Sequence, residues 1–126
     1  MLAVDHRLRD SDAFRRTVRS GRRAGSAALV THLLVAESAL AESARVGFVV
    51  SKAVGGAVVR NRVRRRLRTR CRSHLSTLPD SAELVVRALP PSASMASSEL
   101  DAELARCLER VLRTDSAATA RTGAAS

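Results

Sequence analysis

One segment, Ser51–Arg72, constrains this chain more than any other, because it joins a glycine turn to a run of extreme arginine density. It reads SKAVGGAVVRNRVRRRLRTRCR. Like charges three or four residues apart destabilise a helix. A helix that only faces solvent does not need so many of them. We therefore expect an anionic partner to offset the repulsion.

The same segment also has the apolar spacing of a helix that packs on a core. We predict a helix over about residues 57–76, with Val59, Val63, Leu67 and Cys71 in one apolar stripe. The opposite arc carries Asn61, Arg64, Arg65, Arg68 and Arg72. Arg60 and Arg70 fall near the stripe, so their charged heads must extend to the helix margin.

Three interpretations of this helix are open on the residues alone: a solvated basic face, a generic phosphate-binding helix, and a site for a specific structured RNA. Asn61 favours a shaped site, because an amide can hydrogen-bond bases and sugars as well as phosphates. The helix start after Gly55 and Gly56 leaves free N–H groups that favour an anion. Lys52 lies just before it and adds a point charge.

Composition agrees with a folded domain that has a polyanionic partner. The chain has 126 residues, 45% of them hydrophobic, and a net charge of +10 with a pI near 11.6. Lys52 is the single lysine. The bias towards arginine and alanine is also typical of a GC-rich genome. With no signal peptide or membrane-spanning run in the sequence, the cytoplasm is the expected location.

The order of predicted elements indicates an α+β sandwich. We predict a helix over residues 11–21, a turn or strand start at 21–25, strands at 27–36 and 45–50, the basic helix, a strand at 83–89 and a last helix from about residue 98. The two strands at 27–36 and 45–50 are expected to form an antiparallel pair. Residues 1–113 would form one domain, and residues 114–126 a disordered tail.

No catalytic or metal site of the protein itself is predicted. The histidines His6, His32 and His74 have no metal-binding spacing. Cys71 and Cys107 fall at apolar helix positions and are interpreted as reduced core residues. A nuclease that cleaves without an RNA subunit is disfavoured, because the sequence has no paired acidic residues at suitable positions.

The segment RVGFVVSKAVGGAVVRNRVRRRLR resembles the signature of the bacterial ribonuclease P protein subunit. The matching positions are Ser51, Lys52, Gly55, Ala57, Val58, Arg60, Asn61, Arg62, Arg64 and Arg65. Residues 6–8, Phe14 and Gly21 are similar to the N-terminal part of that family, and residues 84–88 to its last strand. The resemblance covers about residues 6–113.

The resemblance implies an α-β-β-β-α-β-α fold similar to domain 2 of ribosomal protein S5, with a left-handed βαβ crossover. It also implies that the RNA subunit hydrolyses the substrate with Mg²⁺ that the RNA mainly holds. The protein would bind this RNA through Lys52, Arg60, Asn61, Arg62, Arg64, Arg65 and Arg68. It would hold the 5′ leader of precursor tRNA in a cleft between the first helix and the sheet, and it would act as a monomer.

Two departures from the family pattern concern these sites. Ala53 and Gly56 stand where a lysine and an asparagine are frequent. Val18, Ala28 and Thr31 stand where the leader cleft often has aromatic residues, and the chain has no Tyr or Trp. Since stacking on an aromatic ring contributes about 1–3 kcal/mol per base, we predict a weaker or differently built cleft from Phe14, Val18 and Thr31, with Phe14 as its best platform.

Two functions of different classes follow. The first is the accessory protein of an endoribonuclease, which promotes removal of the leader to give the mature tRNA 5′ end. The alternative is a ribosomal-type structural RNA-binding protein without a processing role.

Overall fold

The computed structural model describes residues 11–35, 44–79 and 81–124, and the side chains of 15–35, 44–79 and 81–113. The element order confirms the predicted α+β class with the α-β-β-β-α-β-α sequence. The elements are α1 (Ser11–Ser20), β1 (Arg22–Gly25), β2 (Leu29–Val35), β3 (Arg45–Val50), α2 (Ala57–Arg72), β4 (Ala82–Ala88) and α3 (Ser97–Ala124), with short 3₁₀ helices η2 (Leu75–Thr77) and η3 (Pro90–Ser94).

The four strands form one mixed sheet in the order β1-β2-β4-β3. β1 and β2 form an antiparallel hairpin, β4 runs antiparallel to β2, and β3 runs parallel to β4. The predicted pairing of the strands at 27–36 and 45–50 is therefore wrong, because β4 lies between them. Leu84, Val85 and Val86 are fully buried, and a strand buried on both faces belongs in the middle of a sheet.

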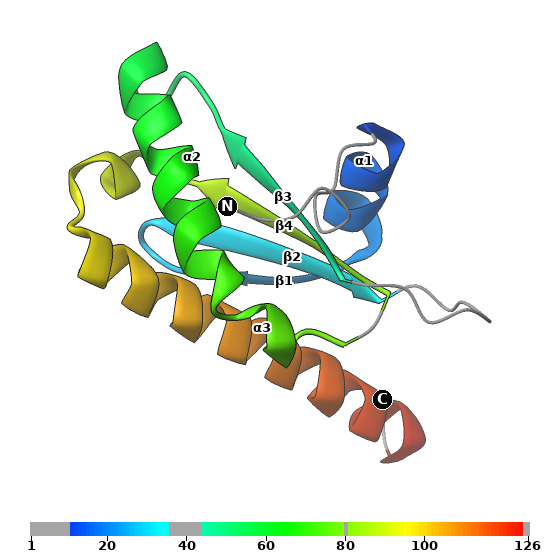
Figure 1. The fold of residues 1–126 in the computed structure, drawn as a ribbon. Coiled ribbons are helices and arrows are strands. Elements are labelled where there is room, and N and C mark those ends of the chain that lie inside the picture. Colours follow the sequence, from blue (N-terminus) through cyan, green and yellow to red (C-terminus); the bar gives the residue numbers. More distant parts are fainter. Residues whose placement is uncertain (1–10, 36–43, 80, 125–126) are drawn as a thin grey trace.

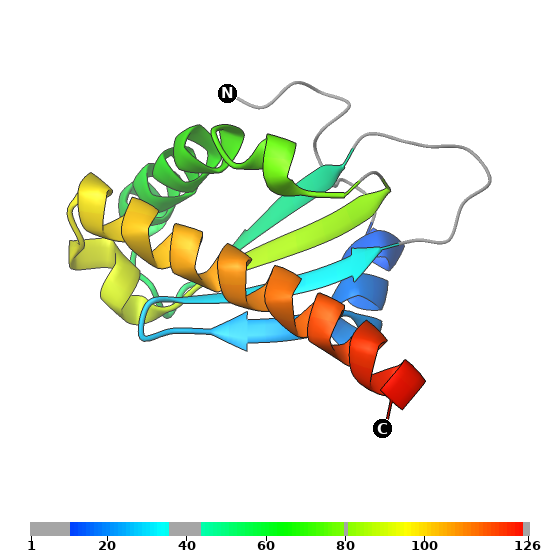
Figure 2. The same cartoon turned by 90° about the horizontal axis from the view of Figure 1, so that it is seen from below.

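The connection from β3 through α2 to β4 joins two adjacent parallel strands. Figures 1 and 2 show that α2 crosses the sheet so that this connection is left-handed, as the resemblance implies. Such crossovers are right-handed in about 98% of cases. With this uncommon handedness, the basic helix α2 lies over β3, and it contacts β3 and α3.

Two helices cover one face of the sheet and one helix covers the other. α2 and α3 lie side by side on the first face, and α1 crosses the second face over β2 and β4 (Figures 1 and 2). The larger core lies under α2 and α3. The smaller cluster lies under α1, where Val18 and Val49 pack on Val85.

The apolar stripe predicted for α2 supplies that helix's share of the core. Val63, Leu67 and Cys71 are fully buried, and Val59 is half-buried. Both cysteines are free and buried, as expected. Burial raises the pKa of Cys71 to about 12 and also raises the pKa of Cys107, so both thiols stay protonated.

The last helix is longer than expected. α3 continues to Ala124, so residues 114–124 are helical where the sequence predicted a disordered tail. The domain limit at residue 113 stays a prediction.

Candidate nucleic-acid interface

A tight turn after β3 sets the start of α2. The N–H of Val54 donates to the carbonyl of Ser51, and the N–H of Gly55 to that of Lys52. Gly55 has φ +157°, and an added Cβ would lie 2.9 Å from Cγ1 of Val59. Only glycine fits both demands. Lys52 is exposed on this turn.

The N-terminus of α2 is open and lacks any acidic neutraliser. Gly56 is the N-cap and offers no side-chain hydrogen bond, and no acidic residue lies in the first turn. A Cβ built on Gly56 would have no atom within 4 Å. The first N–H groups of the helix therefore remain available, and the helix dipole favours an anion there.

The outward face of α2 carries most of the predicted RNA-binding residues. Asn61 and Arg65 are exposed, and Arg64 and Arg68 are half-buried. Arg60 lies near the apolar stripe instead, where its Nε is buried without a partner among the described residues. Nη1 of Arg64 donates to Oδ1 of Asn61 over 3.2 Å, which orients the amide. Arg64, Arg65 and Arg68 give this outward surface of α2 its positive charge, and the exposed Lys52 lies just before the helix.

Arg62 lies on a different side of α2 from this surface. Its Nη2 donates to the carbonyl of Ala93 over 3.2 Å, and Nη1 of Arg66, one turn later, donates to the carbonyl of Met95 over 3.3 Å. Nε of Arg62 is buried without a partner in the part of the chain that the structure describes. The sequence groups Arg62 with the other predicted RNA-binding residues, whereas its head group is bonded to the η3 segment.

On the opposite face of the sheet, α1 is anchored by one carboxylate. Thr17 is fully buried, and its hydroxyl donates to Oε2 of Glu83 over 2.9 Å, while Arg16 forms an ion pair with Oε1. Gly21 lets the chain turn directly against β2, since an added Cβ would lie 2.7 Å from the carbonyl oxygen of Leu33. These contacts fix α1 over the part of the sheet that contains Glu83 and Leu33.

The strand register shows what α1 leaves uncovered. Val30, Arg87 and Val49 are partners across β2, β4 and β3, and His32 and Val85 form the next row. α1 packs over Val85, and the residues of the first row border the space beside the helix. A groove of about 360 Å³ lies there, lined by Arg15, Val18, Arg19, Val49 and Arg87.

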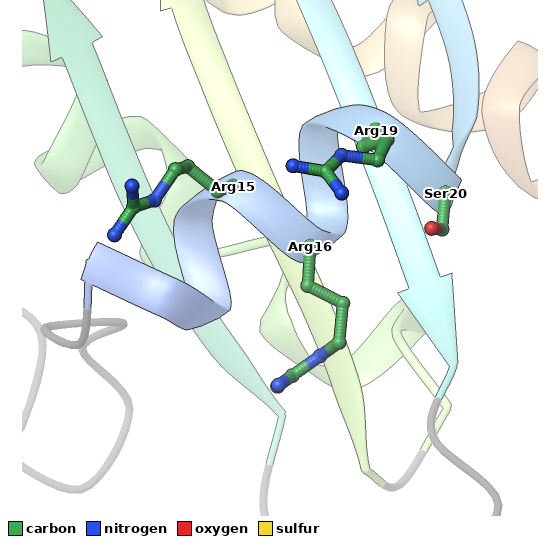
Figure 3. Close-up of a pocket in the computed structure, with 4 residues that line it drawn as sticks. All are labelled: Arg15, Arg16, Arg19 and Ser20. Carbon is green, nitrogen blue, oxygen red and sulfur yellow. The ribbon is translucent and has the colours of Figure 1, made fainter.

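A second groove shares walls with the first and is larger, at about 480 Å³. It is lined by Val18, Arg19, Gly21, Arg23, Val30, His32, Arg87 and Leu89. Figure 3 shows a neighbouring pocket on α1, lined by Arg15, Arg16, Arg19 and Ser20; in it Arg15 and Arg19 lie on successive turns of the helix, while Arg16 projects in another direction. We call the two grooves together the α1 groove: an aliphatic floor with arginines around its rim.

His32 is the titratable residue in this groove. It is only 6% exposed, and its Nδ1 is buried without a partner. Burial, followed by the charges of Arg87 and Arg23, lowers the pKa of His32. The imidazole is therefore neutral at neutral pH.

The predicted cleft residues have different outcomes. Val18 lines the α1 groove. Thr31 does not: it is fully buried and donates to the carbonyl of Ala24 over 2.9 Å, so its assignment to the cleft is wrong. Phe14 belongs to α1, but its side chain lies outside the described part.

Sequence reasoning missed His32, Arg19, Arg23, Arg87 and Val49. The alternation of a strand was the available signal: Leu29, Thr31 and Leu33 are buried on the α3 side, so Val30 and His32 point to the other face. A shift of one residue exchanges the two faces.

Among the described side chains, those of residues 15–35, 44–79 and 81–113, there is no group of three or more His, Cys, Asp or Glu that could hold a metal ion. The donor set in this part of the chain thus does not fit a Mg²⁺ site built by the protein alone. No helix within residues 11–35, 44–79 and 81–124 is both long and apolar enough to cross a membrane.

Comparison with known proteins identifies the family of this chain. The sequence profile of the Ribonuclease P family matches residues 2–112. The ribonuclease P protein component of a Nocardioides species is 60% identical over 111 residues, covering 88% of this chain and 95% of the relative. That of Streptomyces avermitilis is 48% identical over 118 residues, covering 89% and 96%. The relatives come mostly from GC-rich actinobacteria.

Solved structures agree on the fold. The RNase P protein of Staphylococcus aureus superimposes with a TM-score of 0.73 at 24% identity, over 82% of this chain and 93% of the other. That of Thermotoga maritima gives 0.71 at 21% identity, over 83% and 96%. The chain therefore belongs to the family of ribonuclease P protein components.

Proposed function

We propose that this protein is the accessory subunit that binds the catalytic RNA of ribonuclease P through α2. Lys52, Arg60, Asn61, Arg64, Arg65 and Arg68 contact this RNA, and the open N-terminus of α2 receives a phosphate. Arg62 supports the surface from the side by its bond to the η3 segment. The exposed positions of Lys52, Asn61 and Arg65 support this assignment.

The α1 groove holds the single-stranded 5′ leader of precursor tRNA. Its aliphatic floor accepts bases, and its arginines can pair with phosphates or stack their guanidinium planes on bases. No aromatic side chain lines the groove among the described residues. The leader is therefore held by cations and aliphatic contact, which makes this step more sensitive to salt than stacking on aromatic rings.

The observation that carries the proposal is that both surfaces meet at one end of the sheet. Val49 and Arg87 of the groove lie at the carboxyl ends of β3 and β4. The same end of β3 leads directly through Lys52 into the N-terminus of α2. One RNA assembly can contact α2 on one side and extend a single strand across the sheet to the α1 groove on the other.

In this function the RNA performs the hydrolysis with Mg²⁺ that it mainly holds itself. The protein acts as a monomer in the cytoplasm, and it raises the affinity for precursor over mature tRNA. The product is a tRNA with a mature 5′ end.

Reconstitution tests the proposal against its alternatives. The protein is added to a bacterial ribonuclease P RNA and a precursor tRNA at low Mg²⁺, and cleavage at the 5′ end is measured. Enhanced cleavage that requires both components supports the proposal. Binding without enhancement supports a ribosomal-type structural protein, and cleavage by the protein alone would show a nuclease of the protein itself.

A further inference from the structure

The described side chains that line the α1 groove include several cations and no acid. Arg19 comes from α1, Arg23 from β1 and Arg87 from β4. In the part of the chain that the structure describes, no hydrogen bond or ion pair occupies these three guanidinium groups. Arg19 and Arg87 border both parts of the groove, so they define its centre.

The one acid on this face near the cluster, among the described residues, is already engaged. Val85 is the partner of His32 in the strand register, and Glu83 lies two residues before Val85 on the same strand. Glu83 therefore belongs to the next row of the sheet, further from Arg87. Its two carboxylate oxygens are bonded to Thr17 and Arg16 under α1. It is not available to balance a charge in the groove.

His32 is the neutral member of this cluster. Arg23 is its direct partner across β1, and Arg87 is the partner of Val30 one row away. The buried Nδ1 has no hydrogen-bond partner among the described residues. An imidazolium would have two N–H donors, and the described part of the free protein provides neither a counter-charge nor acceptors for that form.

We infer that Arg19, Arg87 and His32 form a subsite for one leader phosphate, and that His32 takes up a proton from solvent when this phosphate binds. The inference rests on the proposed function of the α1 groove and adds a ligand group and a proton to it. A phosphodiester between the arginines adds one negative charge beside the imidazole and offsets part of their positive potential there. The same charge then favours the imidazolium that the arginines alone oppose.

Proton NMR of the full chain tests this directly. The histidine ring resonances are titrated with and without a short single-stranded RNA that has a 5′-hydroxyl end, because a terminal phosphate would itself titrate. His32→Gln identifies the resonance. We expect RNA to raise the pKa of His32 by about one unit, which corresponds to roughly tenfold tighter binding of RNA to the protonated form. An unchanged or lower pKa would overturn the inference.

Variants separate the subsite from a general charge effect. Arg87→Gln removes one wall of the subsite, and Arg110→Gln removes an equal charge from the exposed face of α3. The rise in the pKa of His32 that RNA causes should be lost or at least halved in Arg87→Gln and retained in Arg110→Gln. Equal responses of the two variants would mean that His32 senses only net charge, which contradicts a phosphate subsite.

A second readout uses the assembled ribonucleoprotein. The ratio of affinities for precursor and mature tRNA is measured at about pH 5.5 and about pH 7.5, on either side of the ordinary histidine pKa. The ratio should rise several-fold at the lower pH with the wild-type protein and stay constant with His32→Gln. If the protein enhances cleavage but the ratio does not change with pH, the subsite is wrong while the proposed function stands.

Discussion

At the residue scale, two adjacent glycines have different physical duties. Gly55 has a positive φ and touches Val59, whereas Gly56 faces open space at the N-cap of α2. The sequence presents them only as a pair. The backbone dihedral angle and the distance to Val59 distinguish them, and neither can be read from the sequence.

This difference predicts opposite effects of substitution. Gly55→Ala should lower the free energy of unfolding by about 1–3 kcal/mol, because alanine is strained at this φ and its Cβ meets Val59. Gly56→Asn is the matched control and should change it by only a few tenths of a kcal/mol, in the stabilising direction, since asparagine is a slightly better N-cap than glycine. Urea denaturation measures both. Equal losses in the two variants would contradict the assignment.

A second residue, Glu103 of α3, connects that helix to the β1–β2 turn. It is 8% exposed. Hydrogen bonds from the Ser26 side chain and from Arg106 hold the pKa of Glu103 below its usual 4.5. The ionised carboxylate of Glu103 is therefore more stable in the folded state than in the unfolded chain.

The sign of this shift predicts a loss of stability in acid. The contribution of Glu103 is complete above about pH 4.5 and disappears as pH falls through the lower pKa of the folded state. Glu103→Gln should therefore destabilise the protein at pH 7 and differ less from wild type near pH 3. Glu109→Gln, which removes an exposed partner of Arg113, is the control and should cost less than about 1 kcal/mol at either pH.

At the scale of the element, α2 has two rows of arginines with different partners. Arg62 and Arg66 are bonded to carbonyls of the η3 segment, whereas Arg64 and Arg65 belong to the outward surface. The apolar stripe and the outward arc were predictable from helical periodicity. The inner row was not, because its acceptors are backbone carbonyls some 30 residues later in the chain, as the separations of 31 and 29 show.

The two rows should respond differently to the same substitution. Arg65→Gln should leave the free energy of unfolding unchanged and weaken binding of the catalytic RNA. The slope of the logarithm of the binding constant against the logarithm of the salt concentration should become smaller by up to about one unit, because one phosphate contact is lost. Arg66→Gln should lower the free energy of unfolding by about 1 kcal/mol, through loss of a charged hydrogen bond, with a smaller effect on the slope. Denaturation and binding at several salt concentrations provide the two measurements. The reverse pattern would show that the rows have been assigned wrongly.

At the scale of the whole molecule, the sheet separates the two proposed binding surfaces. The sequence predicted the fold class and the basic helix, and the family resemblance implied a cleft between the first helix and the sheet. It failed on the strand order, because β4 follows α2 in the chain but lies between β2 and β3. It also failed on Thr31, because the register of β2 is set by pairing with distant β4.

The separation predicts that the two surfaces can be impaired independently. Arg19→Gln should weaken binding of precursor tRNA by several-fold and leave binding of mature tRNA unchanged in the assembled ribonucleoprotein, because the mature tRNA has no leader. Arg65→Gln should weaken assembly with the catalytic RNA and so affect both substrates alike. Affinities for the two tRNAs, measured with each variant, give the comparison.

The central position of β4 has a consequence for synthesis of the chain on the ribosome. The hairpin of β1 and β2 and the strand β3 have no contact through the sheet until β4 is inserted between them. The arginine-rich segment leaves the ribosome before that strand does, and its apolar stripe then has no closed core to cover. A nascent chain that ends before Ala82 therefore displays its cations and its stripe together, and the stripe is covered only after β4 and then α3 have emerged.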